Sequence, residues 1–254
     1  MTTELFCGWI AFMLEDMELA PATVNIRVRT VRAFLRYAYE DKGWIAEPVH
    51  KRFKPVNAPI DNVEAFTPDE VKNLFASIDD DTYTGFRTKV IAFVLLDTMV
   101  RVAELVEMKR TNLDMKAGTI MLVEATETKT RITRTVPLSP KTLRILNEYL
   151  AETADFDSEY LFLSYEGKPI TPATGRDNLA LYGKVAGIKD KRVSPYTFRH
   201  TAALFYILNG GDPFSLQKIL GHSHMNMVRR YIQMSNIYIK TQHHVFSPLN
   251  YVYK

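Results

Sequence analysis

The chain of 254 residues contains a single cysteine, Cys7, so it can form no internal disulfide and offers no cysteine cluster to a metal ion. It also lacks long hydrophobic runs. The longest one, residues 90–96, is far shorter than the ~20 apolar residues that span a bilayer. The first ten residues include Glu4 and no basic residue, unlike the start of a secretory signal. These absences exclude disulfide-rich and membrane-spanning classes and favour the cytoplasm.

Several recognisable functional patterns are missing as well. The sequence has no glycine-rich phosphate loop, no spacing typical of metal ligands, no internal repeat and no low-complexity segment. We therefore expect no cofactor. Hydrophobic residues make up 46% and charged residues 24% of the chain, which is typical of a soluble folded protein. The length suits one large domain or two modest ones.

Positive charge is concentrated in the N-terminal part. Between Asn25 and Lys54 there are eight Lys or Arg residues and three acidic ones, an excess of five, whereas the whole chain carries only +3. A helix predicted over 24–41 places apolar residues on one side and arginines around the rest. This pattern fits either a solvated helix face or a footprint for the DNA backbone. The candidate DNA-binding residues are Arg27, Arg29, Arg32, Arg36, Lys51, Arg52 and Lys54.

A change of pattern marks a domain boundary. Residues 54–65 contain two prolines and little hydrophobic periodicity, as in a linker. Thr67, Pro68 and Glu70 then have the types and spacing of a helix start, with a cap, a first-turn proline and a capping box. We predict a helical domain over 1–56, a linker over 57–65 and a second domain over 66–254.

The second domain is predicted to be mainly helical with a small sheet. Residues 90–96 have the pattern of a buried helix, whereas 118–123 and 132–137 have the pattern of two strands in a hairpin. The expected fold class is therefore α+β, mainly α. Helices are also predicted over residues 4–16, 141–153 and 174–187.

The stretch from 194 to 233 carries the residues that a helical core does not need. Arg199 and His200 lie in an apolar helix that breaks at 209–211, and His222 follows a glycine at the end of the next helix. Tyr231 comes nine residues later, after two arginines. Taken singly, Tyr231 could be a packed aromatic and His222 a buried histidine. Together with Arg199, they supply the residue types that hold a phosphate and attack it with a phenol.

This order and spacing resemble the C-terminal signature of the tyrosine recombinases, the phage-integrase family. Residues 98–105 also resemble the family's first box, usually Thr-Gly-Leu-Arg-x-x-Glu-Leu, with Met99 where glycine is common. The predicted turn at 124–131 contains Lys129 and resembles the turn with the family's catalytic lysine. The resemblance extends from about Leu5 to Gln233 and includes the family's helical core-binding domain.

The resemblance implies a role for each candidate. Tyr231 would attack the scissile phosphate and form a 3′-phosphotyrosine bond. Arg101 and Arg199 would clamp the phosphate with forked donors. Lys129 would protonate the leaving 5′ oxygen, and His222 would hydrogen-bond the phosphate.

Other residues near these boxes have supporting or competing roles. We expect Glu104 to orient Arg101 or its helix, and His200 to be structural. Arg131 and Arg134 lie close to Lys129, but an arginine cannot serve as the proton donor because its guanidinium stays charged.

Tyr196 departs from the family pattern, because histidine usually occupies this position and could act as general base. Tyrosine, with an ordinary pKa near ~10, is a poor base at neutral pH, but it can donate a hydrogen bond to the phosphate. Either the base role is small here, or His222 or Lys129 takes it, or the enzyme is slow.

The resulting hypothesis is a site-specific recombinase that cleaves and rejoins DNA strands without metal or ATP. We expect the two domains to form a C-shaped clamp on double-stranded DNA with specific core sites. The tail after Tyr231 would join protomers into a homotetramer on paired sites. A prokaryotic cell or a mobile element is the expected source. The alternatives are a type IB topoisomerase-like enzyme that relaxes DNA and a non-catalytic DNA-binding protein on a decayed recombinase scaffold.

Overall fold

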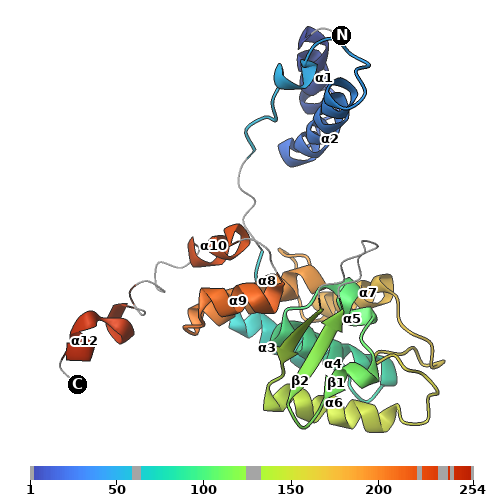
Figure 1. Cartoon of the computed structure of the whole chain (residues 1–254). Helices are drawn as coiled ribbons and strands as arrows, with labels where there is room; N and C mark the ends of the chain where they lie inside the picture. Colours follow the sequence, from blue (N-terminus) through green and yellow to red (C-terminus); the bar gives the residue numbers. More distant parts are fainter. Residues whose placement is uncertain are drawn as a thin grey trace. The chain divides into compact units, whose positions relative to one another are not determined.

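The computed structural model describes residues 3–58, 64–123, 133–221, 225–233, 240 and 243–252. The chain divides into two compact units, Met1–Asn62 and Val63–Lys254, coloured along the sequence in Figure 1. The two are called unit 1 and unit 2 below, and each is described by itself. Within the described ranges, no helix is long and apolar enough to cross a membrane.

Unit 1 is a helical hairpin closed by the segment that follows it. It contains α1 (Thr3–Glu15), α2 (Pro21–Glu40) and the 3-10 helix η1 (Val49–Lys51). Its α2 begins three residues before the predicted start at 24, because Pro21 occupies the first helical turn, where its missing N–H costs nothing. The core residues are Phe6, Ile10, Met13, Val24, Val28, Leu35, Val49 and Phe53.

The segment after η1 is fixed against α2. The side chain of Asn25 donates to the carbonyl of Val56 at 2.9 Å and accepts from its backbone N–H at 2.8 Å. The rings of Phe6 and Phe53 stack with centroids 4.4 Å apart. Residues 49–56 are therefore part of the folded unit and hold a defined position beside α2.

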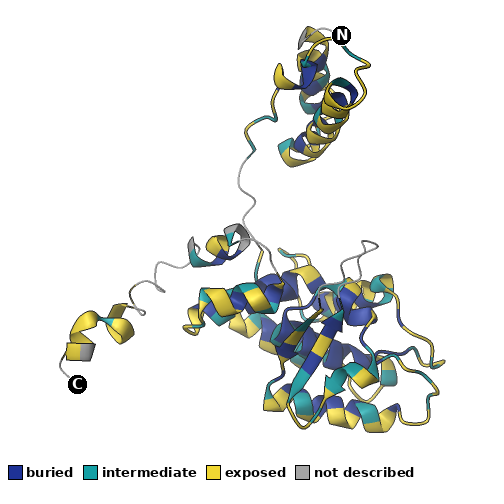
Figure 2. Cartoon of the chain, in the orientation of Figure 1, coloured by how far each residue is buried: buried dark blue, intermediate teal, exposed yellow. Residues whose placement is uncertain are grey.

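Unit 2 is organised around α4 (Tyr83–Thr98), which is buried along most of its length. Val90, Ala92 and Leu95 are fully buried, with 0% of their surface exposed. This confirms the predicted buried helix. Figure 2 shows the buried residues concentrated where other helices surround α4. Its main partners are α6 (Pro140–Glu152), α7 (Pro172–Val185) and α8 (Pro195–Leu208), with α3 (Pro68–Ser77) against α7.

A three-stranded antiparallel sheet covers part of this core. Its order is β1 (Leu113–Asp114), β2 (Thr119–Val123) and β3 (Thr133–Pro137), preceded by η2 (Arg110–Asn112). The pairing of β2 with β3 confirms the predicted hairpin, whereas β1 was not predicted. The structure therefore has the expected fold class, mainly α with a small β-sheet.

The last helices form a second apolar cluster. The short helix α5 (Val102–Val106) follows α4. Later in the chain, α9 (Pro213–Leu220) and α10 (Asn226–Gln233) pack with α8. The helix α12 (Pro248–Val252) lies in the tail. The break after α8 agrees with the predicted interruption at 209–211. This cluster contains Met99, Ala202, Ala203, Ile207, Leu216, Leu220, Val228 and Tyr231.

Two helices of unit 2, α4 and α9, end in a residue with left-handed backbone conformation. Gly221 ends α9 in the left-handed conformation at φ 65°, where glycine has no steric penalty. Met99 ends α4 in the same conformation, at φ 55° and ψ 30°. The turn at the position where the family often has glycine thus keeps a left-handed geometry, although methionine carries a Cβ that disfavours it.

Candidate active site

Three charged side chains meet at the start of α5, two from the first turn of that helix and its cap and one from β3. The carboxylate of Glu104 accepts from the backbone N–H of Arg101 at 2.8 Å and from its guanidinium at 3.0 Å. Arg134 on β3 donates to the two oxygens of the same carboxylate at 2.8 and 2.9 Å. The side chain of Glu104 is only 2% exposed, whereas that of Arg101 is 39% exposed. Glu104 therefore anchors Arg101 from the protein interior.

The charge of Glu104 is stabilised by these contacts. Burial alone would raise the pKa of its carboxyl group, but hydrogen bonds from Arg134 and from the backbone of Arg101 outweigh burial and lower it. The carboxylate consequently stays ionised at neutral pH. A buried, ionised carboxylate orients both guanidinium groups through hydrogen bonds and also attracts their positive charge.

Arg199 is buried in α8 and ties two helix ends together. Its guanidinium donates to the carbonyl of Met99 at 2.5 Å and to that of Leu220 at 2.7 Å. Burial, together with repulsion from Arg101, lowers the pKa of Arg199 to about 10. Arg199 thus remains protonated at neutral pH, and an anion between Arg101 and Arg199 would relieve their repulsion.

Tyr231 lies on α10, 1% exposed. Its hydroxyl is 2.5 Å from Nδ1 of His200. Burial raises the pKa of Tyr231 to about 12, although the charge of Arg199 acts in the opposite direction. The phenol is therefore protonated at neutral pH, and it needs a proton acceptor to become a nucleophile.

His200 lies between two tyrosines. The ring of Tyr196, one helical turn earlier on α8, meets it edge to face with centroids 4.0 Å apart, and the ring of Tyr231 lies 5.6 Å away on the other element. Tyr196 is 67% exposed. The sequence analysis assigned His200 a structural role, and nothing in the sequence indicated its contact with the hydroxyl of Tyr231.

The described part of unit 2 brings together Arg101, Glu104, Tyr196, Arg199, His200 and Tyr231. Lys129 and His222 lie outside the described residues. The sequence analysis considered Arg134 as a competitor of Lys129 for proton transfer and did not predict its contact with Glu104. Arg134 lies on the strand that follows the predicted hairpin turn. This position was the one feature of the sequence that indicated a place near Lys129.

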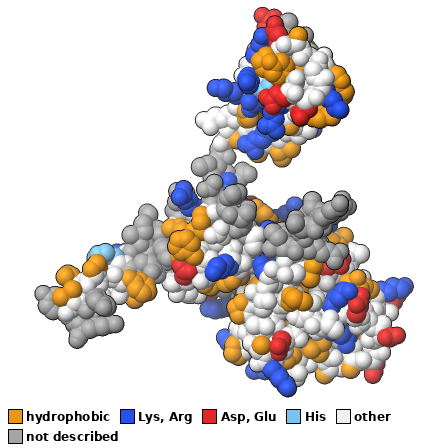
Figure 3. All heavy atoms as spheres, viewed as in Figure 1, with side chains coloured by type: hydrophobic (Ala, Val, Ile, Leu, Met, Phe, Trp, Pro, Cys, Tyr) orange, Lys and Arg blue, Asp and Glu red, His pale blue; other side chains and the backbone are white. Residues whose placement is uncertain are grey.

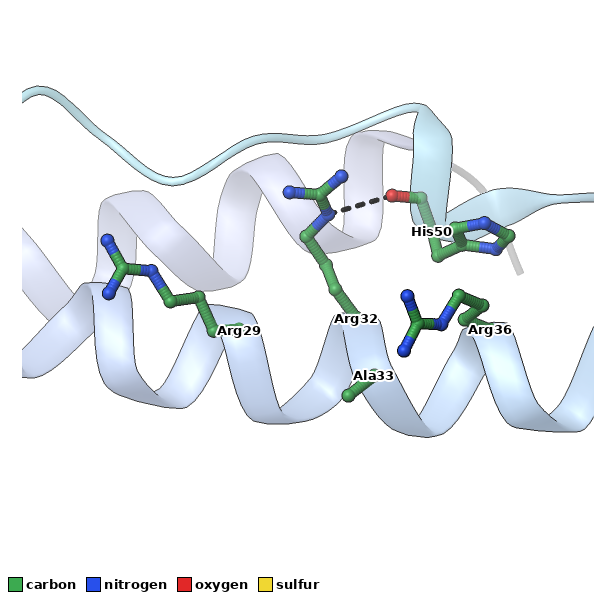
Figure 4. A pocket seen from close by; sticks show the side chains of 5 residues that line it. All are labelled: Arg29, Arg32, Ala33, Arg36 and His50. Atoms are coloured by element: carbon green, nitrogen blue, oxygen red, sulfur yellow. Dashed lines mark hydrogen bonds between the residues drawn. The ribbon is translucent and has the colours of Figure 1, made fainter. Parts of the chain in front are cut away.

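The basic residues of the N-terminal part all lie in unit 1. Figure 3 shows Lys and Arg side chains close together on the visible face of this unit. Arg32 is half-buried, and its Nε donates to the backbone carbonyl of His50 at 2.9 Å (Figure 4). Arg52 forms an ion pair with Glu47. The remaining candidates are exposed: Arg27, Arg29, Arg36, Lys51 and Lys54.

Comparison with known proteins decides the family. The sequence model described as the phage integrase family matches residues 64–236, more than half of the chain. The chain belongs to the phage integrase family. It is a tyrosine-type site-specific recombinase, and the helical architecture with a small sheet is the fold of this family.

Curated relatives of this recombinase are similar over most of its length. Tyrosine recombinase XerD of Listeria innocua is 26% identical over 247 residues, which cover 95% of this chain and 81% of the relative. Tyrosine recombinase XerC of Myxococcus xanthus is 28% identical over 224 residues, which cover 85% and 73%, respectively.

Solved structures show the same fold. The crystal structure of XerA recombinase has a TM-score of 0.62 and 25% identity, covering 98% of this recombinase and 84% of that chain. The Tn1549 transposon integrase in complex with transposon right end DNA has a TM-score of 0.74 and 18% identity, covering 93% and 83%. A lambda integrase dimer bound to a core site has a TM-score of 0.71.

Proposed function

We propose that this recombinase cleaves and rejoins double-stranded DNA at specific core sites through a 3′-phosphotyrosine bond to Tyr231. The observation that carries the proposal is the hydroxyl of Tyr231, 2.5 Å from a ring nitrogen of His200 and within electrostatic reach of Arg199. A phenol beside a proton acceptor and a fixed cation is the arrangement needed to attack a phosphate.

In the cleavage step, the oxygen of Tyr231 forms a bond to phosphorus and its proton passes to Nδ1 of His200. The bond from phosphorus to the 5′ oxygen breaks, and Lys129 gives that oxygen a proton. Arg101 and Arg199 neutralise the two non-bridging oxygens, and His222 hydrogen-bonds the phosphate. Rejoining is the reverse step with the 5′ hydroxyl of another strand, so no metal or ATP is consumed.

In this proposal His200 supplies the base that the family usually has at the position of Tyr196. A tyrosine there is a poor proton acceptor at neutral pH, whereas a histidine in hydrogen-bond contact with the nucleophile can take the proton directly. Tyr196, exposed and packed against the ring of His200, then serves to hold that ring and to donate to the phosphate.

The proposal extends to the whole assembly. Unit 1 contributes contacts to the DNA backbone, unit 2 contributes the chemistry, and the two close on the duplex as a C-shaped clamp. The tail joins protomers into a homotetramer on paired sites. Exposed apolar side chains in the tail support assembly through the tail, because such side chains often mark contacts with another protein. They are Val245, Phe246, Leu249 and Val252, which are 55–70% exposed.

The experiment compares the wild type with Tyr231→Phe on a randomised, pre-nicked duplex library. We expect a protein–DNA adduct that survives denaturant in the wild type alone, and sequencing of the trapped DNA would identify the core site. No adduct from either protein, with salt-sensitive DNA binding retained in both, would instead favour a non-catalytic DNA-binding protein. Plasmid relaxation without exchange between two sites would indicate a topoisomerase.

A further inference from the structure

Met99 joins α4 to the segment that carries Arg101, and its backbone has an uncommon conformation. Its φ is 55° and its ψ is 30°, in the left-handed region where the Cβ of an L-residue lies too close to the following carbonyl oxygen. Within the described ranges, Glu18 is the one other residue besides glycine with a positive φ. Strain of this kind persists only where the surrounding structure holds it, and it is common at functional sites. The contacts of Met99 should therefore show why methionine is kept at this turn.

The backbone of Met99 is held on both sides. Its N–H donates to the carbonyl of Leu95 at 3.1 Å, and its carbonyl accepts from the guanidinium of Arg199 at 2.5 Å. Because α4 is buried along most of its length, this carbonyl is a rigid support for Arg199. Any residue in the same conformation would supply both bonds, so the backbone does not explain the side chain.

The side chain of Met99 packs in a different cluster from its neighbours in the sequence. Leu95 and Val100 belong to the main core around α4, whereas Met99, 4% exposed, belongs to the cluster that contains Tyr231. Among the buried members of that cluster in the described part of the chain, Met99 alone precedes α8. The others lie on α8, α9 and α10. Met99 therefore extends the packing of the rigid helix α4 into the surroundings of Tyr231.

Glycine, which the family often has at this position, could not make this contact. It would relieve the left-handed strain, but the volume of a methionine side chain would be left empty among packed helices. Neighbouring groups relax only partly around such a void. Because α10 packs against α8 and α9, a void in this cluster would let Tyr231 shift relative to Arg199 on α8.

We infer that Met99 is a positioning residue for the cleavage of DNA. Its side chain helps to form the apolar surroundings of Tyr231 while its carbonyl supports Arg199, so one residue fixes the nucleophile and a phosphate-binding arginine relative to each other. The role in cleavage rests on the proposed function of these two residues. Reaction geometry is sensitive to such packing, since a misplacement of ~1 Å can lower a rate by ~10²-fold.

The first test separates the side chain from the backbone by substitutions at this one position. Met99→Ala removes the packing and keeps the strained backbone, Met99→Gly removes both, and Met99→Leu keeps most of the volume. We expect the rate of adduct formation at Tyr231 on saturating pre-nicked duplex to fall by about 10–100-fold in Met99→Ala and Met99→Gly. Met99→Leu should stay near the wild-type rate, and DNA affinity should not change in any of the variants. A wild-type rate in Met99→Gly would overturn the inference.

A matched control distinguishes positioning from a general loss of stability. Met108 is 2% exposed and belongs to the main core, so Met108→Ala makes the same deletion in the other cluster. Urea midpoints of the two alanine variants should fall similarly, whereas Met99→Gly should be more stable than Met99→Ala, because glycine has no Cβ to strain the turn. We expect Met108→Ala to keep the wild-type adduct rate. An equal loss of rate in Met108→Ala would overturn the positioning role.

The second test observes the phenol directly. The full chain is labelled with meta-fluorotyrosine, and Tyr231→Phe identifies the ¹⁹F signal of Tyr231. We expect this signal to shift or broaden in Met99→Ala and Met99→Gly and to keep its wild-type position in Met99→Leu and Met108→Ala. An unchanged signal in both Met99→Ala and Met99→Gly would overturn the inference even if the adduct rate falls.

The proposed function and this inference fail in different ways. No adduct from the wild type would overturn the proposed function, whereas a ¹⁹F signal that moves in Met99→Gly would still support the packing of Met99 around Tyr231. An adduct that the wild type and all variants at position 99 form at the same rate would overturn this inference and leave the proposed function intact.

Discussion

At the scale of single residues, our proposal assigns activation of the nucleophile to the pair formed by Tyr231 and His200. The hydroxyl is buried and protonated, because burial raises the pKa of Tyr231 to about 12. A base in solution cannot reach a buried phenol efficiently. The ring nitrogen 2.5 Å away is in a position to accept the proton during attack.

Replacing His200 with glutamine is expected to slow adduct formation by about 10²–10⁴-fold, the contribution typical of general base catalysis. Glutamine keeps a polar group near the hydroxyl but cannot take its proton. The measurement is the rate of covalent adduct formation on a pre-nicked duplex across pH, and Tyr196→Phe, measured beside it, shows how much the loss of the neighbouring hydroxyl alone contributes. A rate in His200→Gln that equals the wild type and rises equally with pH would contradict the base role.

Tyr196→His restores the residue that the family usually has. The side chain is 67% exposed, so the smaller ring creates no buried cavity, and histidine can still donate to a phosphate. We expect an adduct rate within about tenfold of the wild type. A loss of about a hundredfold would show that Tyr196 has a specific role that histidine cannot take over.

At the scale of elements, Arg134 connects β3 to two helix ends. It donates to both oxygens of Glu104 at the start of α5, and its Nε donates to the carbonyl of Ile219 at 2.9 Å near the end of α9. A Cβ on Gly221 would lie 3.0 Å from its guanidinium carbon. The sheet therefore positions Arg101 and the end of α9 through one side chain.

Arg134→Met is expected to destabilise unit 2 by about 3 kcal/mol, the lower end of the range for breaking a buried ion pair, because Arg101 still contacts Glu104. Urea unfolding measures the loss. The double variant Arg134→Met/Glu104→Gln should recover part of it, since no buried charge then lacks its main partner. If the double variant is less stable than the single one, the loss comes from packing and not from leaving the buried charge of Glu104 without its main partner.

The lowered pKa of Glu104 predicts acid sensitivity. A carboxyl group with a folded pKa below its ordinary value of 4.5 contributes stability above that value. This contribution is lost as the pH falls through the folded pKa. Urea midpoints between pH 7 and acid pH should fall less in Glu104→Gln than in the wild type. The exposed neighbour Glu107 provides the control, Glu107→Gln, and a wild-type-like curve for Glu104→Gln would refute the assignment.

The elements also show what the sequence could reveal. Helix starts were predictable where Ser or Thr precedes Pro, because the hydroxyl of Thr67 or Ser139 caps the helix through a local contact. The left-handed Met99 was not, since methionine rarely adopts this conformation. The bonds of Glu104 with Arg134 and of Tyr231 with His200 join residues 30 and 31 positions apart, so no local pattern indicates them.

At the scale of the whole molecule, two units with separate cores divide binding from chemistry in our proposal. The core of unit 1 is separate from that of unit 2, which suits a division in which unit 1 contacts DNA and unit 2 acts on it. Recombination needs assembly of protomers as well as cleavage, because strands from two sites must be brought together. In our proposal the tail provides the contacts for this assembly.

Substituting aspartate at Phe246 and Leu249, which are 70% and 64% exposed, should prevent protomers from assembling on DNA. A charge in an apolar contact is disfavoured because it loses hydration without a partner. We expect adduct formation on a single pre-nicked site to stay near wild type, whereas exchange between two sites falls more than about tenfold. Sedimentation of the DNA complexes measures the assembly, and the double variant His243→Asp/His244→Asp adds the same two negative charges nearby without removing an apolar side chain. Equal loss of exchange in this control would mean that charge, and not an apolar contact between protomers, accounts for the effect.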